Sequence, residues 1–175
     1  TKAEGGAVDA PMFQGVHDDL RDDDGSLKDL WHGTPQRREF EAFDDRRIGD
    51  RDPGFYGRGH YLTPDRSLAE SYSDDEDGNP GTVMGPMYAA LKNPFIWDVS
   101  TDDAKHRTAR ALQSMGVATG KSRLDPWDLI KPSEMDTFMA AMRERGHDGV
   151  LRKTSHGLSE IVVFKPSAIK HRDAE

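Results

Sequence analysis

Residues 57–72 constrain the fold most, because this short segment has to contain a turn, a strand and a helix. Gly57 and Gly59 lack a Cβ atom, so the backbone there can adopt positive φ and approach a ligand closely. Thr63 and Asp65 are both residue types that cap helices, and either predicts a helix beginning directly after the strand. The chain is therefore expected to leave a loop, form a short strand and reverse into a helix.

Two tyrosines lie on either side of this predicted bend. Tyr61 is expected on the strand and Tyr72 on the helix, so the two rings can face each other across a flat ligand. Aromatic rings in such pairs contribute about 0.5–1.5 kcal/mol beyond the area that they bury. The alternative is that both rings belong to the hydrophobic core, and the segment alone leaves this open.

Composition limits the classes of protein that fit. At 175 residues, the chain is expected to form one domain. The net charge of −8 argues against non-specific binding of nucleic acid by the whole surface. The absence of cysteine excludes disulfides and thiolate metal sites. The seven histidines are scattered without a His-Glu-x-x-His motif, so no metal site is expected.

Residues 1–27 contain few large apolar side chains and end in an acidic run that includes Gly25. This composition predicts a linker or mobile arm over 1–27, with Met12 and Phe13 as an anchor. The catalytic domain is then expected over 28–172. No signal peptide or membrane-spanning run is recognised in this sequence, which indicates a domain that works in the cytoplasm of the producing or the target cell.

A short buried strand over 27–31 is followed directly by His32, Gly33 and Thr34. A histidine at a strand end, followed by glycine, puts an imidazole and a backbone N–H on the same rim of a sheet. His32 is therefore a candidate binding residue. The alternative, a structural histidine with satisfied hydrogen bonds, stays open at this point.

The loop over 35–58 is rich in arginine within an acidic protein. Guanidinium groups match the geometry of phosphates, so this loop could meet a diphosphate or a nucleic-acid strand. The alternative is neutralisation by Asp44, Asp45 and Asp50. The arginines are Arg37, Arg38, Arg46, Arg47, Arg51 and Arg58.

The second half of the chain alternates strands and helices without the regular rhythm of a parallel sheet, which favours an α+β domain. Strands are expected over 87–91, 95–97, 149–151 and 160–164. One helix is expected over 101–116, and a second begins at Pro132 with Ser133 as its cap. The apolar stripe of this second helix is interpreted as core, because its members recur at helical spacing: Met135, Phe138, Met139 and Met142.

Glu160 opens the most apolar strand in the sequence. A charge there is costly unless it has a partner or a function. The alternative is a carboxylate that faces water at a strand edge.

Several of these segments together resemble the ADP-ribosyltransferases of the His-Tyr-Glu class, which includes diphtheria-toxin-like enzymes and poly(ADP-ribose) polymerases. The nearest resemblance is to small bacterial and phage domains of polyvalent, MuF-like and polymorphic-toxin proteins. It covers about residues 29–170 and implies a split β-sandwich core with flanking helices. The segments that carry it are Leu30-Trp-His-Gly-Thr34, Gly57-Arg-Gly-His-Tyr-Leu-Thr63, Tyr72, Gly146-His-Asp-Gly149, Ser159-Glu-Ile-Val-Val-Phe164 and Phe164-Lys-Pro-Ser-Ala-Ile-Lys170.

The resemblance implies NAD⁺ as the substrate and no metal. It implies three catalytic residues, His32, Tyr61 and Glu160, of which Glu160 would stabilise the oxocarbenium-like ribose. His32 and Thr34 would bind the adenosine ribose, and Gly33 would offer backbone groups to the nicotinamide. The further residues implied in NAD⁺ binding are Arg58, Ser67, and Tyr61 with Tyr72, whose rings would enclose the nicotinamide.

Two positions depart from the family pattern. The expected serine three residues before Tyr72 is Ala69, so one nicotinamide contact is either missing or made by Ser67 or Ser71. Leu158 stands two residues before Glu160, where arginine-modifying enzymes have glutamate. Arginine is therefore a less expected acceptor.

These features predict a mono-ADP-ribosyltransferase, a toxin, effector or phage-associated domain that acts as a monomer away from membranes on a protein, RNA or DNA acceptor. If the domain is a toxin, a cognate immunity protein is an expected partner. An NAD⁺ glycohydrolase and a non-catalytic ADP-ribose or nucleic-acid binding module are the two alternatives.

Overall fold

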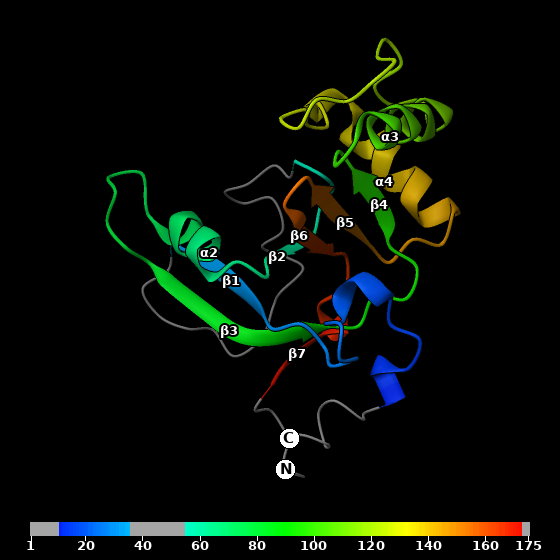
Figure 1. Ribbon diagram of the computed structural model, residues 1–175. Helices are drawn as coiled ribbons and strands as arrows, with labels where there is room; N and C mark the ends of the chain where they lie inside the picture. Colours follow the sequence, from blue (N-terminus) through cyan, green and yellow to red (C-terminus); the bar gives the residue numbers. More distant parts are fainter. Residues whose placement is uncertain (1–10, 36–54, 173–175) are drawn as a thin grey trace.

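The computed structural model describes residues 11–35 and 55–172. The strands form two β-sheets, and helices lie around them (Figure 1). The first sheet has the order β1-β3-β7 and the second the order β2-β6-β5-β4. The α+β class expected from the sequence is confirmed. The strands are β1 (Leu30–Thr34), β2 (His60–Leu62), β3 (Thr82–Ala89), β4 (Phe95–Asp98), β5 (Gly149–Thr154), β6 (Gly157–Val163) and β7 (Ile169–His171).

Within the described residues, three α-helices accompany the sheets. Helix α2 (Arg66–Ser73) packs against β1 and β3, while α3 (Asp102–Ser114) and α4 (Met135–Glu144) lie together beside the second sheet (Figure 1). Both α3 and α4 occur between β4 and β5 in the chain, and these two strands pair in parallel. The sequence did not predict this parallel pair, because its long connection hides the crossover.

Two hydrophobic cores follow from the alternation of side chains along β5 and β6. Leu151, Ile161 and Val163 belong to the first core, together with residues of the first sheet. Val150 and Val162 belong to the second core, together with α3 and α4. Because successive residues of a strand point to opposite faces, the second sheet contributes to both cores.

The predicted methionine stripe of α4 is confirmed as core, but its predicted cap is wrong. Met135, Phe138 and Met142 are buried, and Met139 packs against the same cluster. A 3₁₀ turn, η4 (Pro132–Glu134), precedes α4, and neither element has a side-chain cap. The Glu134 carboxylate instead accepts a hydrogen bond from the Ala118 backbone N–H at 2.9 Å.

Residues 11–27 are packed, which corrects the expectation of a linker or mobile arm over 1–27. Phe13 and Leu20 are buried in the first core, and the ring of Phe13 meets that of Tyr88 edge-on at 6.0 Å. The His17 backbone N–H also donates to the Leu91 carbonyl at 2.9 Å. Residues 1–10 lie outside the described part of the chain. Residues 11–27 contain two 3₁₀ turns, η1 (Pro11–Phe13) and η2 (Asp18–Leu20). Another 3₁₀ turn, η5 (Pro166–Ala168), precedes β7.

Candidate functional site

A backbone bridge between the two sheets brings the predicted site residues together. The Trp31 N–H donates to the Thr63 carbonyl at 2.8 Å, and the Thr63 N–H donates to the Trp31 carbonyl at 2.9 Å. This bridge places His32 of β1 beside β2, and β2 pairs with β6 so that Tyr61 lies opposite Val162. Glu160 is two residues before Val162 on the same strand. Segments far apart in the sequence thus meet at one place.

His32 is tied directly to the strand that carries Tyr61. Its Nδ1 lies 2.7 Å from the Tyr61 carbonyl oxygen. A carbonyl can only accept, so in this bond Nδ1 carries the proton and the lone pair of the neutral ring is on Nε2. Burial lowers the pKa of His32 below 6.5, and the charge of nearby His60 acts in the same direction, while the bond to Tyr61 opposes both. The folded protein therefore favours the neutral imidazole.

The lowered pKa of His32 predicts a loss of stability in mild acid. Below pH 6.5 the unfolded chain binds a proton at His32 more readily than the folded chain does. The contribution of the neutral His32 to the free energy of unfolding is therefore complete above pH 6.5 and is lost as the pH falls toward the folded-state pKa. Urea unfolding at pH 7.5 and pH 5.5 should show a smaller acid-induced loss in His32→Gln than in the unmodified protein. His156→Gln, in an exposed turn, is the control, and an equal loss in all three proteins would contradict the prediction.

Gly33 is required by the packing of α2 on β1. A Cβ atom at this position would lie 1.9 Å from the Ala69 carbonyl oxygen and 3.0 Å from the Ser73 nitrogen. Ala69, where the resemblance expects serine, is fully buried. Helix packing is thus a second reason, beyond ligand contact, for a small residue at position 33. Thr34 is buried at the end of the same strand.

The Tyr61 hydroxyl organises the loop before β2. It donates to the Gly57 carbonyl at 2.6 Å and accepts from the backbone N–H groups of Phe55 and Tyr56 at 2.9 and 3.0 Å. The ring is half-buried and packs against the second core. A structural role for this hydroxyl was not apparent from the sequence, which pointed only to the ring.

Glu160 is buried, so the alternative of an edge carboxylate facing water is wrong. The residue is 8% exposed, and its strand β6 lies between β2 and β5 inside the second sheet. The Tyr72 hydroxyl donates a hydrogen bond to Oε1 of Glu160. Oε2 is buried and has no hydrogen-bond partner among the described residues. One carboxylate oxygen is therefore held by the protein, and the other is left as an acceptor.

Tyr72 remains a protonated phenol beside this carboxylate. Burial raises its pKa first, and the hydrogen bond and negative charge of Glu160 raise it further. The ring is nevertheless 46% exposed, because α2 carries it at the surface end of the site. Asp65 caps α2 as expected by accepting from the backbone N–H groups of Ser67 and Leu68.

Sequence reasoning missed two residues beside Glu160. Arg152 of β5 is its direct cross-strand partner, so both side chains lie on one face of the sheet. The Arg152 guanidinium lies over the Tyr56 ring at 5.1 Å, donates to Ser159 Oγ at 3.3 Å and donates to the Pro126 carbonyl. A regular hairpin closed at Thr154 and Gly157 would pair position 152 with 159, and the register shift between Arg152 and Lys153 brings Arg152 opposite Glu160 instead. There was therefore no direct signal for this pair in the sequence.

Tyr56 is largely buried under this guanidinium. Burial raises the pKa of Tyr56 to about 12, against the opposing effect of the Arg152 charge. The phenol therefore stays neutral at physiological pH.

The remaining predicted residues lie apart from this group or outside the description. The Arg58 guanidinium pairs with Asp136 of α4 at 2.5 Å, and its backbone N–H approaches the Met139 sulfur at 3.3 Å. Ser67 and Ser71 are exposed on α2, where the Ser71 hydroxyl donates to the Leu68 carbonyl. The other loop arginines, Arg37, Arg38, Arg46, Arg47 and Arg51, and the neighbouring Asp44, Asp45 and Asp50 fall outside the described residues.

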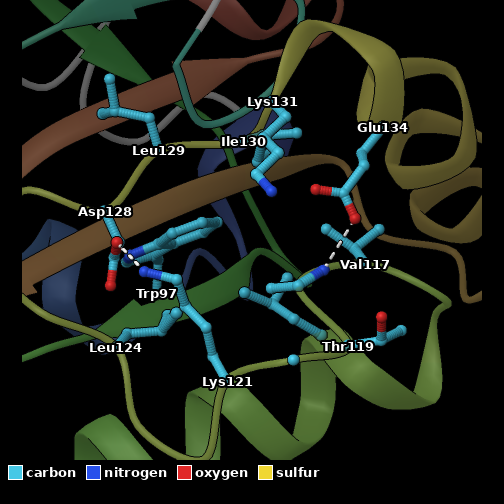
Figure 2. A pocket seen from close by; sticks show the side chains of 13 residues that line it. Trp97, Val117, Thr119, Lys121, Leu124, Asp128, Leu129, Ile130, Lys131 and Glu134 are labelled. Carbon is cyan, nitrogen blue, oxygen red and sulfur yellow. Dashed lines mark hydrogen bonds and ion pairs between the residues drawn. The ribbon is translucent and has the colours of Figure 1, made fainter.

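A separate cavity of about 240 Å³ lies between α3 and the segment that precedes α4 (Figure 2). Its lining includes Trp97 and Leu124, and it contains neither His32 nor Glu160. The Lys121–Asp128 ion pair lies on one wall of the cavity, and the hydrogen bond that the Ala118 N–H donates to the Glu134 carboxylate lies on the opposite wall (Figure 2). The cavity is therefore distinct from the residues gathered around Glu160.

Within residues 11–35 and 55–172, no group of three or more His, Cys, Asp or Glu side chains is placed to hold a metal ion. None of the helices in the described part of the chain is long and apolar enough to cross a membrane.

Comparison with known protein families identifies the family. A family model with the description "ADP-Ribosyltransferase in polyvalent proteins" matches residues 22–175. No curated protein matches the chain. The matched range includes every residue gathered around Glu160.

Proposed function

The chain belongs to the family of ADP-ribosyltransferases found in polyvalent proteins, and from this we propose that it transfers single ADP-ribose units from NAD⁺ to a macromolecular acceptor, protein or nucleic acid, with release of nicotinamide. The observation that carries the proposal is the state of Glu160. A carboxylate that is buried, held through one oxygen and unpartnered at the other is costly to maintain. A substrate that develops positive charge would offset that cost.

The chemistry assigned to Glu160 follows from the charge that develops during transfer. When the bond between ribose C1′ and the nicotinamide nitrogen breaks, its electron pair leaves with nicotinamide and the ribose becomes oxocarbenium-like. A carboxylate fixed beside this centre stabilises the transition state more than the ground state. The acceptor nucleophile then forms a bond to C1′ and releases a proton, which Glu160 would accept as general base.

The other residues are proposed to position NAD⁺. His32 and Thr34 would bind the adenosine ribose, which suits a neutral imidazole with its lone pair on Nε2. Tyr61 and Tyr72 would enclose the nicotinamide ring, and Gly33 would contact its carboxamide. Arg58 and Ser67 stay predictions as NAD⁺ contacts. The Arg58 side chain pairs with Asp136, and Ser67 is exposed on α2.

Tyr72→Phe is expected to lower kcat/KM for nicotinamide release about tenfold. The change removes the hydrogen bond to Oε1 of Glu160 while keeping the ring, and a charge-assisted hydrogen bond contributes about 1.5 kcal/mol or more. Steady-state nicotinamide release measures the effect. Tyr88→Phe, in the first core, is the control and should leave turnover unchanged. Equal kinetics for Tyr72→Phe and the unmodified protein would show that this bond does not support the reaction.

One incubation tests the proposed function against its alternatives. Labelled NAD⁺ and a bacterial extract are incubated with the protein, and the products are treated separately with protease and nuclease. Macromolecular label supports transfer, and its loss to one of the two treatments names the acceptor class. Free ADP-ribose equal to the nicotinamide released would instead indicate a glycohydrolase. Binding of ADP-ribose without nicotinamide release would indicate a non-catalytic module.

The biological setting is part of the proposal. Membership of the polyvalent-protein family supports a bacterial or phage-associated effector, acting as a monomer in the cytoplasm of the producing or the target cell. If this effector is toxic, a cognate immunity protein would be its second partner.

A further inference from the structure

Exposed apolar side chains lie on segments that are hydrogen-bonded to the residues around Glu160. In the part of the chain that the structure describes, four large hydrophobic side chains are exposed: Phe55 41%, Tyr72 46%, Trp127 75% and Leu129 46%. Tyr72 is bonded to Glu160 itself. The other three lie in the two segments that border the site. Clustered exposed hydrophobic residues mark interaction surfaces more often than isolated ones do.

Trp127 is presented by a turn that is fixed at several points. The Asp128 backbone N–H closes the turn on the Asp125 carbonyl at 3.0 Å. The Asp128 carboxylate accepts from the Asp125 N–H at 2.6 Å and pairs with Lys121 (Figure 2). Pro126 occupies the second position, where its fixed φ favours the turn. The turn is thus rigid although its indole is largely in solvent.

The same turn is connected to the catalytic group on both sides. The Pro126 carbonyl accepts from Arg152, the cross-strand partner of Glu160. Three residues after Trp127, the Ile130 N–H donates to the Phe55 carbonyl at 2.9 Å, and the Phe55 N–H is held by the Tyr61 hydroxyl. The exposed side chains are therefore carried by backbone segments that are tied by hydrogen bonds to the residues proposed for the chemistry.

The charges beside these side chains favour a protein over a nucleic acid. Lys121 is paired with Asp128, and Arg123 contacts Asp102 at 3.3 Å and Asp125 at 3.5 Å. Lys131 is the exposed cation beside them that pairs with no acid among the described residues. Cations that are already neutralised release few counterions on contact with phosphates, which is the main source of nucleic-acid affinity. An exposed tryptophan on a turn with a fixed backbone matches instead the aromatic anchors at the centres of protein interfaces.

We propose that Phe55, Trp127 and Leu129 form the docking surface for the acceptor, and that the acceptor is a protein that places an apolar side chain against the Trp127 indole. This inference rests on the proposed function and specifies its acceptor. A docked protein would present its modified residue to the ribose beside Glu160. The surface would act on acceptor binding and leave the cleavage of NAD⁺ by water unaffected.

Trp127→Ala tests the docking surface with two readouts from the same preparations. Nicotinamide release without acceptor should equal that of the unmodified protein, whereas protein labelling in nuclease-treated bacterial extract should fall about 10- to 30-fold, as for loss of an interface anchor. Trp127→Phe should keep most of the labelling, because the aromatic contact remains. Lys131→Ala, which removes an exposed neighbouring cation, should leave labelling unchanged.

The outcomes separate this inference from the proposed function. Unchanged labelling by Trp127→Ala, or an equal loss of labelling and nicotinamide release, overturns the docking surface. Label that forms in untreated extract, is removed by nuclease and is weakened by Lys131→Ala overturns it in favour of a nucleic-acid acceptor. Nicotinamide release by the unmodified protein without any protein label also overturns it, but leaves NAD⁺ cleavage standing. The proposed function itself is refuted by the absence of nicotinamide release from the unmodified protein, or by nicotinamide release with free ADP-ribose as the sole other product.

Discussion

Replacing Glu160 with glutamine is expected to lower the rate of nicotinamide release about 1,000-fold while the protein stays folded. Loss of one charged or hydrogen-bonding group at a transition state costs about 100- to 1,000-fold, and loss of a general base adds to that cost. The amide carbonyl can still accept from the Tyr72 hydroxyl, which now bonds Oε1. The amide is neutral, so it can neither stabilise an oxocarbenium-like ribose nor accept the acceptor's proton.

Glu70→Gln is the matched control for this experiment. It makes the same chemical change on the exposed surface of α2, where Glu70 forms an ion pair with Arg66 at 3.7 Å. Surface pairs of this kind contribute roughly 0–1 kcal/mol, so its activity and melting temperature should match those of the unmodified protein. Near-normal turnover in Glu160→Gln would refute the assignment of Glu160. Circular dichroism distinguishes a catalytic effect from unfolding.

Gly33→Ala is expected to lower the free energy of unfolding by about 3 kcal/mol or more, at the upper end of overpacking effects. The added Cβ atom would lie 1.9 Å from the Ala69 carbonyl oxygen. This oxygen belongs to the backbone of α2, so relief requires the helix to move away from β1 and cannot come from a side-chain rotation. Urea unfolding measures the loss. The displaced helix would also carry Tyr72 away from Glu160, so activity should fall under conditions where the variant is still folded.

Gly120→Ala provides the comparison for Gly33→Ala. A Cβ atom at Gly120 would meet nothing within 4 Å, and this glycine is not among those with positive φ. Its unfolding free energy should therefore change by less than about 1 kcal/mol. Similar stabilities for the two variants would mean that the contact between α2 and β1 is looser than the structure indicates.

The parts of the fold that the sequence predicted are those in which local pattern and packing agree. The stripe of α4 recurs at helical spacing because one face of that helix covers the second core. Asp65 caps α2 because its carboxylate has the two N–H groups of Ser67 and Leu68 within reach. Glu160 stood out because a charged side chain is unfavourable in a strand of apolar residues. Residues that depart in this way from the local pattern occur at functional sites.

The missed features depend on contacts between residues distant in sequence. Residues 11–27 have few apolar side chains, and Phe13 is buried as the expected anchor, but Leu20 is also almost completely buried once the first sheet exists. The reason for glycine at position 33 is the carbonyl of Ala69, which only the folded chain brings close. Arg152 is one of many arginines in the sequence, and only the pairing of β5 with β6 places it beside Glu160. The site could be predicted as a set of residues, but not as a geometry.

The two sheets contribute different halves of the proposed site. His32 belongs to the first sheet and Glu160 to the second, and the Trp31–Thr63 bridge joins them through the backbone. A substrate that contacts both residues would add a connection between the sheets, so its binding and the stability of the fold are linked. At a concentration 100 times its Kd, such a ligand stabilises the folded state by about 2.7 kcal/mol. Each turnover would end that connection when ADP-ribose leaves with the acceptor, because until then its diphosphate still joins the ribose at His32 to the ribose at Glu160. The enzyme would then be most resistant to unfolding while its substrate lasts, and its lifetime would fall as it depletes NAD⁺.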